Sequence, residues 1–231
     1  MILQECLNQL ARGKLSNLAL ASDGYIKDTF LLKVLDAFNE AYSRVNTALN
    51  LNVGRFKIKY TPTVTKYVLT TEHLITNGED PEEFYIEEFL EDSFKDDLSS
   101  ILSIKDNLNN PLPLNSSANV NSLFFSFPNV LSIPKLHKDV KELEILYRKN
   151  PKPFDLSSFE SEINIPDNAL GALFSYTAFL IHSDMNGENA VQNAQKYLSE
   201  YQAIINQIIS ENTIQESIQT VKSKFNARGF V

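Results

Sequence analysis

The stretch Ile165–Ile208, IPDNALGALFSYTAFLIHSDMNGENAVQNAQKYLSEYQAIINQI, contains two helical patterns in succession, separated by Met185-Asn186-Gly187-Glu188. The first pattern is apolar on more than one side, whereas the second keeps one apolar stripe at spacings of three and four residues. The stripe comprises Val191, Ala194, Leu198, Tyr201, Ile205 and Ile208. These patterns predict a helical hairpin whose first helix has more apolar surface than one partner can cover.

That first helix presents three kinds of surface. A stripe of mostly small residues, which lets another backbone come close, comprises Gly171, Ser175, Ala178 and His182. A stripe of larger residues comprises Leu173, Thr177, Leu180 and Ile181. Tyr176 and Phe179 point in other directions. Either a neighbouring subunit covers the additional surface, or this helix is the fully buried central helix of a monomer.

The N-terminal region, residues 1–54, predicts two more helices. Ile2, Cys6 and Leu10 recur every four residues, which is typical of a short amphipathic helix that ends at Gly13. A longer apolar stripe follows over five turns: Leu31, Val34, Leu35, Phe38, Ala41, Tyr42, Val45, Ala48 and Leu49.

We expect the second helix of the hairpin to pack on this long helix. The predicted contacts on the hairpin side are Val191, Leu198, Tyr201 and Ile205. The predicted contacts on the long helix are Leu35, Phe38 and Val45.

The pattern changes from residue 55 onward. Phe56, Ile58 and Tyr60 alternate with lysines, which predicts a half-buried strand. Short apolar runs separated by turn-forming residues follow at 67–69, 101–104, 123–127, 130–133 and 143–147. We expect 67–69 to be the strand that returns beside 56–60. Several short strands in succession predict an antiparallel sheet or a small barrel-like domain.

These elements predict an α+β protein. The N- and C-terminal helices have apolar seams without local partners, so they are expected to form one antiparallel helical bundle with an inserted antiparallel β domain. The predicted parts are the first half of the bundle at 1–54, the β-rich insertion at 55–164, the hairpin at 165–210 and a C-terminal arm at 211–231.

The net charge of −8 is concentrated in one segment. Residues 79–97 hold ten acidic residues and one lysine, so the rest of the chain carries about +1. This distribution argues against a basic nucleic-acid-binding protein, which needs lysines and arginines that face phosphate. The segment is interpreted as a solvated helix face or loop on the outside of the bundle, or alternatively as a docking site for a basic partner.

The remaining bulk features indicate a protein of a reducing compartment. Cys6 is the one cysteine, which excludes an internal disulfide. Met1–Glu5 lacks the basic and apolar regions of a secretory signal. The apolar stretch Asn168–Ile181 is shorter than the roughly 20 residues of a membrane-spanning helix, so no membrane partner is expected.

No catalytic, cofactor-binding or metal-binding residues are predicted, and we expect that the protein is not an enzyme. The seven glycines are too scattered for a phosphate-binding loop. His182, Asp184 and Glu188 have poor spacing for metal ligands, and a predicted turn separates them. Cys6 lies on an apolar stripe and is expected to be buried.

Leu10–Leu18, LARGKLSNL, resembles the LA-x-GELSNL opening of the head-to-tail adaptor proteins of short-tailed bacteriophages, also called tail tubular protein A or ring proteins. Further similar segments follow in the family's order: Ala41–Val45, Tyr67–Leu69, Phe94–Leu98, Asn109–Asn115, Leu146–Arg148 with Pro151, and Ile165–Glu188. The resemblance covers roughly residues 2–210. The enlarged acidic segment near 72–97 and the tail after about 210 depart from the family's pattern. The asparagine-rich style and the acidic insertion are similar to the ring proteins of crAss-like phage necks.

The resemblance implies a structural virion protein, assembled in the host cytoplasm, that forms a ring in the phage neck. Such a ring, implied to be a dodecamer, joins the portal protein to the tail and surrounds the DNA channel without sequence-specific DNA binding. The implied partners are other copies of the chain, the portal, the next ring or nozzle protein, and tail fibres. The resemblance leaves open whether the ring forms before the portal is bound.

Two sets of residues are candidates for these contacts. A ring subunit has two neighbours, and the candidates for that interface are Gly171, Ser175, Tyr176, Ala178 and Phe179. The basic arm supplies the candidates for portal contact: Lys222, Lys224, Phe225, Arg228 and Phe230. The alternative for the arm is that it lies along its own subunit or stays unfolded.

Two alternatives for the function come from other classes. One is a soluble adaptor that binds another protein partner outside a phage neck. The other is an enzyme whose site is assembled from distant residues.

Overall fold

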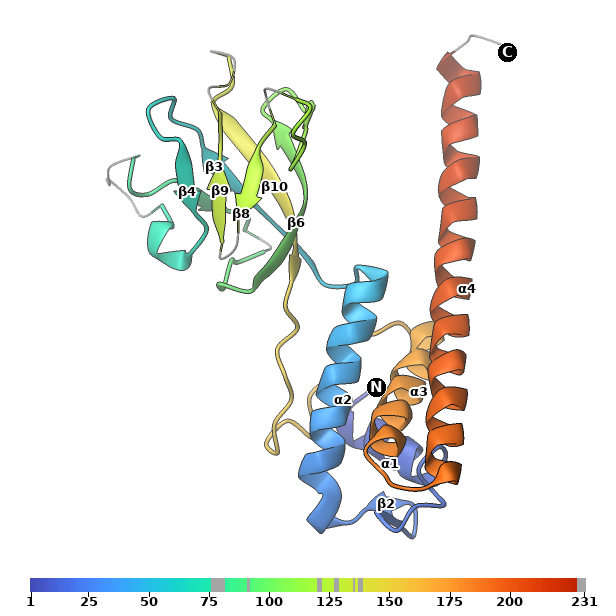
Figure 1. Cartoon of the computed structure of the whole chain (residues 1–231). Coiled ribbons are helices and arrows are strands. Elements are labelled where there is room, and N and C mark those ends of the chain that lie inside the picture. Colours follow the sequence, from blue (N-terminus) through green and yellow to red (C-terminus); the bar gives the residue numbers. More distant parts are fainter. Residues whose placement is uncertain are drawn as a thin grey trace. The chain divides into compact units, whose positions relative to one another are not determined.

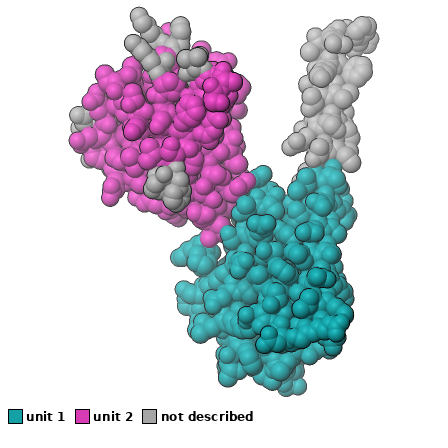
Figure 2. Space-filling view, in the orientation of Figure 1, with its two compact units in different colours: residues 1–51, 152–231 teal, residues 52–151 magenta. Residues whose placement is uncertain are grey.

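The computed structural model describes residues 1–75, 82–90, 92–119, 122–126, 129–134, 136 and 139–227, and from 212 onward it describes the backbone alone. The chain divides into two compact units, one formed by residues 1–51 with 152–231 and the other by 52–151 (Figure 2). The first unit is helical and the second is rich in strands, so the predicted α+β class is confirmed.

The helical unit contains four helices within the described residues (Figure 1). They are α1 (Leu3–Arg12), α2 (Asp28–Leu49), α3 (Asp167–Ser183) and α4 (Glu188–Ala227). A two-stranded hairpin, β1 (Ala21–Ser22) and β2 (Tyr25–Ile26), connects α1 to α2. All four helices contribute to one apolar core, whose buried members include Leu3, Leu10, Val34, Phe38, Leu173 and Ile205.

Helix α3 is the central helix of this unit. It packs against both α2 and α4, which explains why its sequence is apolar on more than one side. Ala169, Ala172 and Leu173 are fully buried. The two-sided apolar pattern therefore has partners within the subunit, as the alternative of a buried central helix requires.

Helix α4 packs chiefly against α3, so the predicted pairing with α2 named the wrong main partner. Tyr201 and Ile205 are buried, but Leu198 is half-buried and Val191 is 54% exposed. The recurrence of apolar residues every three or four positions predicts which face of α4 points inward. It does not predict which helix covers that face.

The segment after the insertion belongs to the helical unit. The Phe154 ring lies 6.1 Å from the ring of Phe38 and 5.1 Å from that of Tyr42, measured between centroids. The Asn39 side chain donates to the Phe154 carbonyl and accepts from its N–H, each at 2.8 Å. These contacts correct the predicted insertion of 55–164 to 52–151 and shorten the first helical part from 1–54 to 1–51.

The strand-rich unit contains two antiparallel sheets in its described part. The five-stranded sheet has the order β5 (Ile86–Glu88), β3 (Val53–Lys59), β10 (Glu142–Lys149), β6 (Leu98–Asp106) and β7 (Pro111–Leu112). The three-stranded sheet has the order β4 (Lys66–Val68), β9 (Val130–Ser132) and β8 (Phe124–Ser126). A short 3-10 helix, η1 (Thr71–His73), follows β4. The prediction that 67–69 returns beside 56–60 is wrong, because β4 pairs with β9 in the other sheet.

Inward side chains of both sheets share a second core. Phe56 faces Ile145 across the β3–β10 pair, and Tyr67 of the smaller sheet is fully buried in the same cluster. The buried hydroxyl of Tyr67 accepts from the Thr61 N–H at 2.9 Å and donates to the Thr61 carbonyl at 3.2 Å. Partnered hydroxyls of this kind make the burial of tyrosine possible in an apolar core.

Helix α4 continues through the predicted boundary at residue 210, so the hairpin and the first part of the arm are one helix. Its 40 residues correspond to about 60 Å, whereas the 17 residues of α3 correspond to about 25 Å. By length alone, α3 can cover less than half of α4.

Candidate interaction surfaces

The outer face of the five-stranded sheet carries a row of alternating charges. Lys57 on β3 stands opposite Glu87 on β5 and opposite Glu144 on β10, and Glu144 stands opposite Lys105 on β6. Opposite charges at directly paired positions stabilise a sheet by roughly 0.2–1 kcal/mol per pair. The row is therefore charged at each strand but nearly neutral in sum.

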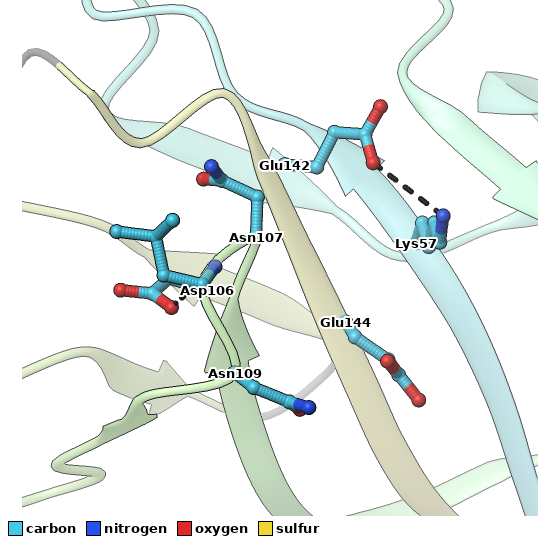
Figure 3. Close-up of a pocket in the computed structure, with 7 residues that line it drawn as sticks. Lys57, Asp106, Asn107, Asn109, Glu142 and Glu144 are labelled. Carbon is cyan, nitrogen blue, oxygen red and sulfur yellow. Dashed lines mark hydrogen bonds and ion pairs between the residues drawn. The ribbon is translucent and has the colours of Figure 1, made fainter.

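A polar pocket of about 370 Å³ opens on this face beside the turn that follows β6 (Figure 3). Its lining residues are Lys57, Asp106, Asn107, Leu108, Asn109, Glu142 and Glu144. The Lys57 ammonium lies 3.4 Å from a Glu142 carboxylate oxygen, and this ion pair is visible at the pocket edge.

Asp106 holds the turn that forms one wall of the pocket. Its carboxylate accepts from the backbone N–H groups of Leu108 and Asn110 at 2.9 and 2.8 Å, and from the Asn110 side chain at 2.9 Å. The side-chain bond from Asn110 is the main reason why the pKa of Asp106 is lowered. The Asp106 carboxylate thus holds the turn in place, and the turn forms the pocket wall.

The acidic segment forms part of the strand-rich unit. It contains β5, and Tyr85, Ile86 and Phe94 are buried in the core. Within 82–90 and 92–97 no helix is present, so the helix-face interpretation is wrong there. Apart from β5 these residues are mostly loop, with Glu82, Glu83, Glu87 and Glu88 exposed, as the loop interpretation expects, whereas 79–81 and 91 lie outside the described residues.

Several carboxylates of the segment bind groups elsewhere in the unit. Asp92 accepts from the Arg55 N–H at 2.7 Å and forms an ion pair with Lys149. Asp96 accepts from the N–H and hydroxyl of Thr71 at 2.6 and 2.5 Å. These bonds connect the segment to β3, η1 and β10.

Asp97 extends the same set of bonds by accepting from the Tyr147 hydroxyl at 3.1 Å. Burial, followed by the Asp97 charge, raises the pKa of Tyr147. A basic partner would have to compete with these internal bonds, which leaves fewer free carboxylates for docking than the sequence suggested.

Two of the five ring-interface candidates, Gly171 and Ser175, contact α4, and a third, Ala178, is buried in the helical unit. A Cβ atom on Gly171 would stand 3.2 Å from Cδ1 of Ile204. The Ser175 hydroxyl donates to the Gly171 carbonyl at 2.9 Å and to Glu200 at 3.3 Å. Ala178 is fully buried. Gly171 and Ser175 thus bring α4 close to α3, and Ser175 and Ala178 are covered within their own subunit.

Tyr176 and Phe179 keep part of their surface exposed. Their ring centroids are 5.3 Å apart, and the Tyr176 ring also lies 4.8 Å from that of Tyr201 on α4. Both side chains are half-buried. Tyr176 packs against α4, and both residues keep part of their surface accessible.

The structure does not place the portal-contact candidates. Lys222, Lys224 and Phe225 lie on the backbone of α4 beyond the last described side chain, and Arg228 and Phe230 lie outside the described residues.

A polar junction that sequence analysis missed connects the loop after α1 to α3 and α4. The Lys14 ammonium forms an ion pair with Glu200 and lies 4.9 Å from the ring centroid of Tyr197. The Tyr197 hydroxyl donates to the Lys14 carbonyl at 3.2 Å, and the ring of buried His182 packs 5.3 Å from that of Tyr197. Lys14 lies in the LARGKLSNL segment, but its partners are more than 160 positions away, so the pattern alone could not reveal the junction.

Of the three residues considered as metal ligands, His182, Asp184 and Glu188, the first two make other contacts. Asp184 forms an ion pair with Lys33 of α2 at 2.5 Å, and His182 is buried beside Tyr197. No group of three or more His, Cys, Asp or Glu residues is arranged to hold a metal ion in the described part of the chain.

Cys6 is fully buried in the helical core, as predicted for a small apolar residue. Burial raises the pKa of its thiol to about 12. Among the described residues, no helix has the length and apolar character needed to cross a membrane.

Comparison with models of protein families gave no match for this chain, and comparison with curated proteins gave none either.

Proposed function

We propose that this chain is the subunit of a ring-forming head-to-tail connector of a short-tailed bacteriophage, which joins the portal to the tail around the DNA channel. The observation that carries the proposal is the interrupted layout: a helical unit built from both ends of the chain and a strand-rich unit inserted as residues 52–151. In this proposal the helices form the antiparallel bundle that the connector resemblance implies.

The positions of the similar segments support the proposal. Leu10–Leu18 covers the end of α1 and the following loop, where Leu10 and Leu15 are buried. In Ala41–Val45 of α2, Ala41, Tyr42 and Val45 are buried, and Ile165–Glu188 covers α3 and the turn before α4. Each of these three segments therefore supplies residues to the core of the helical unit, where a shared fold constrains sequence most strongly.

The surface features are compatible with a subunit that has two neighbours. A closed ring needs two different contact surfaces on each subunit. The half-exposed pair Tyr176 and Phe179 is our candidate for one of them, because interface centres are enriched in aromatic side chains. Residues 79–97 carry a charge of about −9, and like charges would keep DNA phosphate from adhering to that surface.

Co-sedimentation with the portal tests the proposal. The purified chain is mixed with portal rings of its own phage and separated on a gradient, and we expect the chain to move with the portal at a fixed ratio. A monomer in the absence of portal is compatible with the proposal, because the portal can act as the template for assembly. A chain that stays at the top of the gradient at all protein ratios would contradict it.

A further inference from the structure

The junction around His182 contains a buried group that can take up a proton. His182 lies in the last turn of α3 and is 4% exposed. Its ring packs beside that of Tyr197 on α4, with 5.3 Å between the centroids. Among the described residues, no group forms a hydrogen bond with the buried Nδ1 atom. A proton taken up at Nδ1 would therefore create a buried charge that has no hydrogen-bond acceptor at that atom.

The charged and titratable groups of the junction and of the end of α3 come from the loop after α1 and from α2, α3 and α4. They are Lys14 from the loop after α1, Lys33 from α2, Asp184 at the end of α3, and Lys196, Tyr197 and Glu200 from α4. The two carboxylates are already engaged, Asp184 with Lys33 and Glu200 with Lys14. Both carboxylates of the junction therefore already have a cationic partner.

The end of α3 has an opposing influence. The negative end of the helix dipole favours a cation in the last turn of α3. Burial without an acceptor at Nδ1 disfavours the cation more strongly, and the pKa of His182 is lowered, with desolvation as the main cause.

We propose that His182 is an acid-sensitive latch that holds the loop after α1 against the α3–α4 hairpin and releases it when Nδ1 takes up a proton from solvent. The imidazolium must reach water or an acceptor. The Tyr197 hydroxyl donates to the Lys14 carbonyl and the Tyr197 ring packs against His182, so movement of His182 disturbs the residue that fixes the loop. The strand-rich unit has its own core and does not depend on this junction.

Hydrogen exchange of the full chain tests the latch. Amide exchange is measured at about pH 7.5 and about pH 5.5, on either side of the ordinary histidine pKa, and is corrected for the intrinsic effect of pH on the exchange rate. We expect peptides that cover residues 13–20 and the first turns of α4 to lose protection at the lower pH by up to about tenfold, the limit for one proton on a group whose ordinary pKa is 6.5. Peptides from β3 and β10 should keep their protection.

Two variants separate His182 from other titrating groups. His182→Gln is neutral at both pH values, so it should abolish the difference. His73→Gln is the matched control, because His73 lies in the strand-rich unit, where its ring contacts the Glu83 carbonyl at 2.8 Å. This variant should retain the full loss of protection.

A titration of the wild-type histidines by NMR provides a second measurement that needs no folded His182 variant. The His73→Gln spectrum removes the His73 signal and so assists assignment, and His182 should titrate below its ordinary pKa of 6.5. The proposal is overturned if His182 titrates at or above that value, if the wild type keeps its protection in acid, or if His182→Gln loses protection as the wild type does.

Discussion

Gly171 lies so close to Ile204 that a Cβ atom at Gly171 would stand 3.2 Å from the Cδ1 atom of Ile204. This approach allows α4 to lie against α3 with little space between the two backbones. It also means that the small-residue stripe of α3 serves the fold of one subunit.

Substitutions at Gly171 should distinguish crowding from helix propensity. Gly171→Ala gains about 0.8–1 kcal/mol of propensity, and the end of the Ile204 side chain can move, so the net change should remain within about 1 kcal/mol. Gly171→Leu overfills the seam and should cost about 1–3 kcal/mol. Urea unfolding followed by circular dichroism measures both changes. Adding Ile204→Ala to Gly171→Leu should recover part of the lost stability. If Gly171→Leu costs the same free energy of unfolding with Ile204 as with alanine at position 204, α4 does not cover Gly171.

Asp92 should be a stabilising residue of the strand-rich unit in spite of its place in an acidic segment. Its side chain is 19% exposed and binds both the Arg55 N–H and Lys149, which is 18% exposed. Asp92→Ala leaves both groups without this partner and should cost about 1.5–3 kcal/mol, the range for hydrogen bonds to charged groups. Glu83→Ala, at an exposed position of the same segment, should change stability by less than about 0.5 kcal/mol. If Asp92→Ala and Glu83→Ala change the stability equally, Asp92 has no special stabilising role in the acidic segment.

The Lys14–Glu200 ion pair should give the helical unit an acid-dependent step. Burial alone would raise the pKa of Glu200, but the bond and charge of Lys14 outweigh it, and the pKa is lowered from 4.5. A carboxylate with a lowered pKa stabilises the fold above the pKa of the unfolded chain, and that stabilisation is lost as the pH falls through the folded value. Stability should therefore decrease below about pH 4.5, and Glu200→Gln should flatten this part of the profile. An unchanged profile in the variant would assign the step to other carboxylates.

The Cys6 thiol should report on opening of the helical unit. Cys6 is fully buried and its pKa is raised to about 12, so the reactive thiolate is scarce near neutral pH. A thiol reagent should modify the native chain slowly and the urea-unfolded chain rapidly, with one reactive site per chain. Rapid modification of the native chain would show that α1 does not stay packed against the helical core.

The sequence predicted the individual helices and strands better than it predicted which of them pack together. The stripe from Leu31 to Leu49 predicted α2, and the alternation at Phe56–Tyr60 predicted β3, because amphipathic periodicity is a local property. The partners of Tyr67 and Leu198 were predicted wrongly. Strand pairing and helix packing depend on side chains far apart in sequence, and an apolar face does not specify which apolar face covers it.

The candidate surfaces show the same distinction. Gly171, Ser175 and Ala178 were correctly grouped on one face of a helix, but the sequence did not reveal that α4 of the same subunit covers that face. Asp92 and Asp96 looked like parts of a charged surface because their partners, Lys149 and Thr71, lie 57 and 25 positions away. A charge run in sequence records composition and does not record which carboxylates bind groups inside the fold.

The most direct test of the connector proposal is electron microscopy of the full chain bound to portal rings of its phage, with averaging around the ring axis. The proposal predicts an additional ring of density on one end of the portal, twelvefold as the connector resemblance implies, with a helical and a strand-rich part in each subunit. Portal particles that remain bare in the presence of excess chain would contradict it.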